Sequence, residues 1–205
     1  GQTDTILNTG AIIENTYFRT ITTDACGKDA STPILIKRYF PGHVMQAINP
    51  LTVITNVNWN YNMGYRFTPL VNGVVTEVGG NWSSGVTHKV HLFEYPSGNP
   101  IDSFSVTGTG DWHYDTISPI SLTAGQKYVV TVRLNAQRSG KYGRTQFPIT
   151  KGNVLVHGGT YLDSTNAMPR NLITYYAYGY ADLKFEACVY SGDVYCEDTL
   201  VCSGT

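Results

Sequence analysis

The sequence predicts an all-β fold, an antiparallel β-sandwich or jelly roll, formed by a single domain over residues 1–205. Apolar and polar residues alternate along many short segments, which is the period of a β-strand rather than of a helix. Only 14% of the residues are charged, whereas Gly, Thr, Asn and Tyr are abundant. This composition suits strands joined by turns, so long helices are not expected.

Short strands are expected in the first half of the chain, separated by turn clusters such as "YPSGNP" and "TGTGD". Strand candidates before residue 110 span residues 10–18, 33–40, 51–60, 71–78, 87–95 and 100–106. The first two of these would form the N-terminal strands of residues 1–41. Short strands at such spacings favour a sandwich or jelly roll over a parallel α/β sheet.

The second half contains two strands with a clear inward face. In residues 124–134, one face carries Tyr128, Val130, Val132 and Leu134, and the opposite face carries Lys127, Thr131 and Arg133. This pattern predicts a half-buried strand. In residues 180–190, the inward face carries Leu183, Phe185, Ala187 and Val189, and the outward face carries Asp182, Lys184, Glu186 and Cys188. Residues 153–157 and 172–178 are further strand candidates, and residues 135–152 and 158–171 are expected to be surface loops.

Four cysteines, an even number without a CxxC pair, predict disulfide bonds rather than a zinc site. They are Cys26, Cys188, Cys196 and Cys202. Four cysteines allow three pairings, and the sequence does not choose among them. Disulfides imply an oxidising compartment, so we expect an exported, secreted or cell-surface protein. Because Cys188 faces outward, the Cys-rich tail of residues 190–205 is expected to pack on the outside of the sheet.

Charge and hydropathy narrow the classes of partner. The formal net charge is −1 and the 14 Lys and Arg residues are scattered. A basic stripe that could attract a phosphate backbone is therefore missing, and nucleic acid is not an expected partner. The sequence contains no run of about 18 apolar residues, so no transmembrane segment is predicted. The first residues lack the pattern of a signal peptide.

Residues 42–134 carry motifs that resemble a known family. The motifs are a Gly-x-x-His before a strand, a Gly-x-Trp and a Leu-x-Ala-Gly-x-x-Tyr. They fall at Gly85 and His88, at Gly110 and Trp112, and at Leu122, Ala124, Gly125 and Tyr128. The chain thereby resembles DUF4082, a bacterial extracellular β-sandwich family of unknown function. Related domains are attached to sugar-active or adhesive surface proteins, so the resemblance implies a binding or architectural role.

The segment "DWHYD", residues 111–115, could be a site or ordinary packing. Asp111, His113 and Asp115 share one face of an extended backbone and could hold a cation or supply carboxylates for glycoside hydrolysis. The spacing is also typical of a turn that enters a strand. We favour packing, with Trp112 capping the core. His88 and His91 should point to opposite faces of one strand, with His88 partly buried and hydrogen-bonded, so they are not expected to chelate a metal together.

Aromatic residues in probable loops are the best candidates for ligand binding. Exposed rings stack on the apolar faces of sugars, while neighbouring polar groups hydrogen-bond the sugar hydroxyls. The candidate ligand-binding residues are Trp82, Trp112, Tyr142 and Tyr161, and by composition Trp82 and Tyr142 should be the most exposed. The alternative is that these rings fill half-buried positions of a β-protein.

These observations predict a non-catalytic extracellular module that binds carbohydrate. The alternative is an adhesin or assembly subunit that binds protein, in which exposed sheet edges matter more than aromatic loops. The third hypothesis is a hydrolase that acts on glycans. No catalytic residue, cofactor or catalytic metal is assigned, but the oxygen-rich loops "TGTGD" and "YLDSTNA" could bind structural calcium.

Overall fold

The computed structural model describes residues 16–18, 21–24, 27–30, 34–36, 42–163 and 165–187. All four cysteines lie outside these ranges, as does the tail of residues 190–205, so the disulfides and the position of the tail stay predictions. The chain divides into two units, Gly1–Tyr39 and Phe40–Thr205. The assignment of all 205 residues to one domain also stays a prediction.

The first unit contains short antiparallel strand pairs. β1 (Thr16–Phe18) pairs with β4 (Ile34–Ile36), and β2 (Ile21–Asp24) pairs with β3 (Gly27–Ala30). The predicted strands at residues 10–18 and 33–40 therefore contain β1 and β4.

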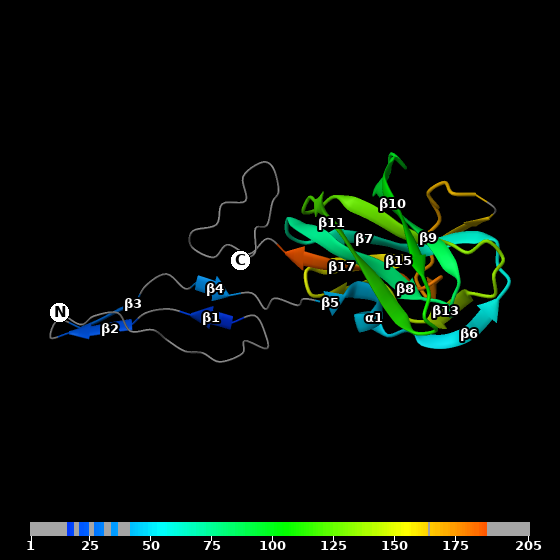
Figure 1. Cartoon of the computed structure of the whole chain (residues 1–205). Helices are drawn as coiled ribbons and strands as arrows, with labels where there is room; N and C mark the ends of the chain where they lie inside the picture. The colour runs from blue at the N-terminus through cyan, green and yellow to red at the C-terminus, as the bar shows by residue number, and fades with distance from the viewer. Residues whose placement is uncertain are drawn as a thin grey trace. The chain divides into compact units, whose positions relative to one another are not determined.

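The second unit is built from antiparallel sheets, which confirms the all-β prediction (Figure 1). A six-stranded sheet has the order β10-β9-β12-β7-β15-β14, a four-stranded sheet the order β11-β8-β17-β5, and a three-stranded sheet the order β16-β13-β6. The strands are β5 (Gly42–His43), β6 (Leu51–Val57), β7 (Tyr61–Pro69), β8 (Gly73–Asn81), β9 (Thr87–Tyr95), β10 (Pro100–Thr107), β11 (Trp112–Leu122), β12 (Lys127–Arg133), β13 (Gly140–Arg144), β14 (Ile149–Lys151), β15 (Val154–Asp163), β16 (Tyr176–Tyr178) and β17 (Ala181–Ala187).

One hydrophobic core draws side chains from both of the larger sheets. The predicted inward residues of β12 and β17 contribute to it: Tyr128, Val130, Val132, Leu134, Leu183 and Phe185 are buried there, and Ala187 packs against it. Several residues opposite them are also apolar and buried, namely Val90 and Leu92 on β9 and Val75 and Val78 on β8. Burial of this shared apolar face supplies the main favourable term in folding.

The outward faces of two strands are more buried than their sequences predict. On β12, Thr131 is fully buried and Arg133 nearly so. On the same face of β12, Val129 packs with Phe93 and Met168 in a second apolar cluster. On β17, Asp182 is fully buried instead of exposed. Its carboxylate accepts hydrogen bonds from the backbone N–H groups of Met45 and Gln46, at 2.7 and 2.8 Å.

Asp182 thereby caps a helix that the sequence analysis did not predict, α1 (Val44–Ile48). The capping carboxylate lies more than 130 residues away along the chain, so no local pattern at residues 42–45 announces the helix. Within the described residues, no helix is long and apolar enough to cross a membrane.

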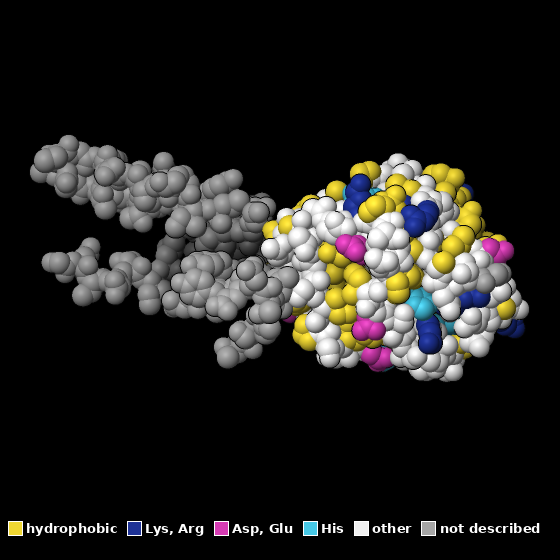
Figure 2. Space-filling model, turned by 90° about the horizontal axis from the view of Figure 1, so that it is seen from above, with side chains coloured by type: hydrophobic (Ala, Val, Ile, Leu, Met, Phe, Trp, Pro, Cys, Tyr) yellow, Lys and Arg dark blue, Asp and Glu magenta, His cyan; other side chains and the backbone are white. Residues whose placement is uncertain are grey.

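The predicted loops also contain strands. Residues 135–152 form β13 and β14, and β15 continues to Asp163 within the predicted loop of residues 158–171. Figure 2 shows that charged side chains are few and scattered on one face of the described surface, among uncharged and hydrophobic ones.

Candidate functional site

The three-stranded sheet β16-β13-β6 presents a row of tyrosines on one face. Tyr142 on β13 lies opposite Tyr178 on β16, and Arg144 lies opposite Tyr176. Because successive residues of a strand alternate between faces, these four side chains point to the same side of the sheet. The residue between the two β16 tyrosines, Ala177, is fully buried in the core. The opposite face of this sheet therefore anchors it to the rest of the unit.

This row forms one wall of a groove with a volume of about 290 Å³. The other wall comes from the ends of β7 and β15 in the six-stranded sheet, where Tyr161 pairs with Met63. We call this feature the tyrosine groove, and it is lined by Trp59, Tyr61, Met63, Tyr142, Tyr161, Tyr176 and Tyr178. Two of the four predicted ligand-binding residues, Tyr142 and Tyr161, thus lie in one groove.

Contacts between the rings fix the shape of the tyrosine groove. The Tyr142 ring stacks on Trp59, with centroids 5.7 Å apart and planes inclined by 13°, and meets Tyr176 edge-on at 5.1 Å. The Tyr161 ring, on the other wall, meets the ring of Tyr178 from the first wall edge-on at 5.2 Å. Offset-stacked and edge-to-face pairs of this kind are favourable beyond the area they bury. The groove is therefore formed before any ligand arrives.

Two glycines let the strands approach closely enough to place these rings. A Cβ atom at Gly140 would lie 2.8 Å from Cε3 of Trp59, and one at Gly159 would lie 2.3 Å from the carbonyl oxygen of Tyr176. A side chain at either position would push the neighbouring aromatic residue away. Glycine within a strand often marks such a close backbone approach.

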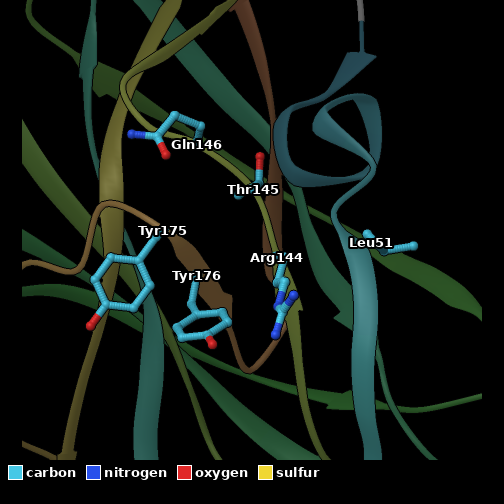
Figure 3. Close-up of a pocket in the computed structure, with 6 residues that line it drawn as sticks. All are labelled: Leu51, Arg144, Thr145, Gln146, Tyr175 and Tyr176. Atoms are coloured by element: carbon cyan, nitrogen blue, oxygen red, sulfur yellow. The ribbon is translucent and has the colours of Figure 1, made fainter.

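A second pocket, with a volume of about 400 Å³, adjoins the groove and shares Tyr176 with it. We call it the arginine pocket, and it is lined by Leu51, Arg144, Thr145, Gln146, Tyr175 and Tyr176. Figure 3 shows Arg144 on the strand between Leu51 and Tyr176, which are its cross-strand neighbours on β6 and β16. The Thr145 N–H donates to the Tyr175 carbonyl at 3.3 Å, which ties the two sides of the pocket together.

The phenol groups of the tyrosine groove can take part in hydrogen bonds to a ligand. Burial, together with the neighbouring tyrosines, raises the pKa of Tyr178 to about 12, so its hydroxyl keeps its proton at neutral pH. Within the described part of the chain, the hydroxyls of Tyr142, Tyr161, Tyr176 and Tyr178 make no hydrogen bond to protein. A phenol both donates and accepts, so these groups are available to a ligand. The residues that line the two pockets include no Asp or Glu.

Trp82 is not exposed, contrary to the sequence prediction. Its side chain is 0% exposed, its Nε1–H donates to the Gly179 carbonyl at 2.7 Å, and its ring meets His88 edge-on. The glycines beside it, which suggested an exposed loop, instead give the ring room: a Cβ atom at Gly80 would lie 2.3 Å from Cζ2 of Trp82. Trp82 is a core residue and cannot offer a face to a ligand.

Trp112 also lies away from the tyrosine groove, and its predicted role as a cap of the core is confirmed. The ring is half-buried against the core and stacks on Tyr180 at 5.7 Å and on Tyr114 at 6.3 Å. On the other face of β11, His113 and Asp115 form an exposed pair at 3.3 Å. The "DWHYD" segment is therefore packed on one face and solvated on the other.

The predicted separation of His88 and His91 is confirmed. His88 is buried in the core, with Nδ1 3.1 Å from the Arg133 carbonyl, and His91 is hydrogen-bonded on the opposite face to Ser103 at 2.6 Å. Among the described residues, no three His, Cys, Asp or Glu side chains group closely enough to hold a metal ion. Structural calcium in the oxygen-rich loops stays a prediction.

A family comparison covers both pockets. The sequence model of a family described as a domain of unknown function, DUF4082, matches residues 48–181. The chain belongs to the DUF4082 family. The match extends well beyond the resemblance at residues 42–134 and includes every residue that lines the tyrosine groove and the arginine pocket. Both features therefore lie inside the DUF4082 domain. A search of curated proteins finds no match.

Sequence reasoning missed several residues of these two pockets. Trp59, Tyr61, Tyr176, Tyr178 and Arg144 were not among the candidate ligand-binding residues. A local signal existed at "YYAYGY", where Tyr176 and Tyr178 stand two residues apart and so share a face of a strand. The pairing of that strand with β13, which brings Arg144 beside Tyr176, cannot be read from the sequence.

Proposed function

We propose that the DUF4082 domain of this chain is a non-catalytic module that binds carbohydrate in the tyrosine groove. The observation that carries this proposal is that Tyr142 and Tyr161, chosen from the sequence as sugar-stacking residues, line one groove with five further residues, four of them aromatic. Tyr161 is 37% exposed and Tyr142 is half-buried, so each ring keeps some surface for a ligand.

The chemistry of the groove suits a sugar ring. The C–H groups of a pyranose present an apolar face that packs on an aromatic ring, and its hydroxyls need hydrogen-bonding partners at the edge. Here the rings supply the apolar surface, and phenol groups without a described protein partner stand at their edges. Because ring–ring contacts hold the walls in place, little conformational entropy is lost on binding, which favours affinity.

The type of β-fold and the cellular location of the protein are part of the same proposal. A core shared by the six-stranded and four-stranded sheets supports a β-sandwich of jelly-roll type. We further propose an exported protein, secreted or at the cell surface, in which the four cysteines form two disulfides. Structural calcium would be compatible with that setting.

A glycan array followed by calorimetric titration tests the proposal. We expect a ligand in the array, and we expect Tyr142→Ala and Tyr161→Ala each to weaken its binding at least tenfold. Ile101→Ala is the matched control, because Ile101 on β10 is 38% exposed, like Tyr161, but lines neither pocket. Far-ultraviolet circular dichroism should show all three variants folded. Binding that survives both tyrosine substitutions would remove the tyrosine groove from consideration.

One observation favours the second candidate function, an adhesin or assembly subunit that binds protein. Among the described residues, β6 pairs only with β13 and so forms an edge of its sheet. Two apolar side chains on it are exposed, Leu51 at 72% and Val53 at 43%. Edge strands with exposed apolar residues are templates for pairing with another chain.

Self-association offers a direct test of this second candidate. If β6 pairs with a second copy, sedimentation velocity should show a dimer at high protein concentration, and Val53→Lys should restore the monomer. A monomer at every concentration would count against assembly through β6. A glycan-acting hydrolase remains a third hypothesis, and it requires two carboxylates about 5–10 Å apart in a cleft.

A further inference from the structure

Arg144 is an exposed cation without a protein partner at the edge of the tyrosine groove. It ends β13, and within the described residues its guanidinium makes no hydrogen bond or ion pair. Two other arginines are engaged: Arg133 donates to Asn60 at 2.6 Å, and Arg170 donates to the Pro96 carbonyl at 2.8 Å. The five donors of Arg144 are therefore free to recognise a group outside the protein.

The surroundings of Arg144 favour an anion. The residues that line the arginine pocket are Arg144 itself and uncharged side chains, so nothing in its described lining neutralises the guanidinium. A planar guanidinium pairs with a carboxylate through two parallel hydrogen bonds and binds sulfate oxygens in a similar way. Thr145 and Gln146, from the same pocket, can donate to or accept from neutral hydroxyls beside that anion.

The spacing connects this cation to the tyrosine groove. Tyr142 and Arg144 are two residues apart on β13, which separates them by about 7 Å along one face. Tyr176 lines both the tyrosine groove and the arginine pocket and lies opposite Arg144 in the sheet. A sugar ring stacked in the groove would thus place a substituent, or the next sugar along the chain, within reach of the guanidinium.

We propose that the arginine pocket binds the anionic group of an acidic glycan, so that this domain prefers sugars carrying carboxylate or sulfate groups to neutral sugars. This inference rests on the proposed function, because the tyrosine groove supplies the stacking surface. Arg144 adds the charge selectivity. The two sources of the anion, a uronic acid and a sulfated sugar, share the same chemistry at Arg144.

Matched oligosaccharides test the inference. Calorimetric titration should compare oligogalacturonate with the same oligomer as its methyl ester, which keeps the sugar rings and removes the charge. We expect the charged form to bind at least tenfold more tightly at low salt, and the difference to shrink as ionic strength rises. A sulfated and an unsulfated oligosaccharide of one backbone form the second arm, which distinguishes sulfate from carboxylate as the preferred anion.

Variants then assign the charge selectivity to Arg144. Arg144→Gln should weaken binding of the acidic oligomer about tenfold and change binding of its neutral form less than twofold. Arg144→Lys should retain part of the preference, because it keeps the charge but not the planar fork. Arg138→Gln is the matched control: it removes the same charge from an exposed arginine that lines neither pocket.

The outcomes separate this inference from the proposed function. If both members of a pair bind equally in both arms, or if Arg144→Gln weakens the neutral and acidic forms alike, charge selection at Arg144 is wrong while glycan binding stands. If no oligosaccharide, neutral or acidic, binds the wild-type protein, both the proposed function and this inference are overturned.

Discussion

The tyrosines around Asp182 and those of the tyrosine groove use the same side chain for opposite purposes. Tyr65 and Tyr114 donate their hydroxyls to the buried Asp182 carboxylate, at 3.2 and 3.0 Å. In the tyrosine groove, the hydroxyl of Tyr178 finds no described protein partner. A hydroxyl engaged inside the fold contributes to stability, whereas an unengaged one is available for recognition.

The burial and the hydrogen bonds of Asp182 give the region around it a structural role. Burial raises the pKa of this carboxyl, and hydrogen bonds from three backbone N–H groups, those of Met45, Gln46 and Leu183, oppose that rise. A buried acid that accepts so many hydrogen bonds joins β17 to the helix α1 and to β7 and β11. This carboxylate offers no free polar atom to a ligand, in contrast to the hydroxyls of the tyrosine groove.

The largest expected effect follows from removing this carboxylate. Asp182→Ala leaves several buried donors without an acceptor, each at a cost of about 1–3 kcal/mol before relaxation, so we expect the free energy of unfolding to fall by about 4 kcal/mol. Urea denaturation followed by tryptophan fluorescence measures this change. A loss below about 1 kcal/mol would contradict the structural role of Asp182.

A matched pair of hydroxyl deletions sharpens the comparison at a smaller scale. Tyr114→Phe removes a donor to Asp182 and should lower the free energy of unfolding by about 1–2 kcal/mol. Tyr178→Phe removes a hydroxyl without a described protein partner and should change stability by less than about 0.5 kcal/mol. Urea denaturation of both variants under one condition provides the test. Equal losses in the two variants would mean that the two regions do not differ in this way.

The sequence predicted some strands at or near their observed boundaries and missed one whose polar face carries glycine and residues typical of turns. Thr87–Tyr95 was predicted at its observed boundaries. Tyr61–Pro69 was missed although Asn62, Gly64 and Arg66 alternate with its apolar residues, because Asn and Gly usually indicate turns. In the structure Asn62 and Arg66 hydrogen-bond to the carbonyls of Ala167 and Arg170, which cover them. Contacts that distant are not encoded in a local pattern.

The candidate site was predicted in part, for a related reason. Composition identified Tyr142 and Tyr161 as available rings, but it placed Trp82 with them because glycines, Ser and Asn surround all such positions. Whether glycine exposes a neighbouring ring or makes room to bury it depends on what packs above it. Gly80 accommodates the buried Trp82, whereas Gly140 lets Trp59 support an accessible Tyr142. Only tertiary pairing separates these two cases.

The smallest expected effect on the free energy of unfolding concerns the charge of Glu77, near the Asp182 region. Glu77 accepts hydrogen bonds from Lys184 at 2.9 Å and from His43 at 2.8 Å. Burial alone would raise the pKa of Glu77, but these two partners outweigh it, so the pKa lies below its usual value. A carboxylate with a lowered folded-state pKa stabilises the protein at neutral pH, and that contribution is lost as the pH falls through the lowered pKa.

Glu77→Gln should therefore lower the free energy of unfolding by at most about 1 kcal/mol at pH 7, because solvent screens this partly exposed pair. Wild type and variant should converge as the pH is lowered past the point where Glu77 takes up its proton. Urea denaturation at a series of pH values measures the difference, with glycan affinity of the folded protein as a control that stays unchanged at neutral pH. A difference that persists at the same size in strong acid would show that shape, rather than charge, is what Glu77 contributes.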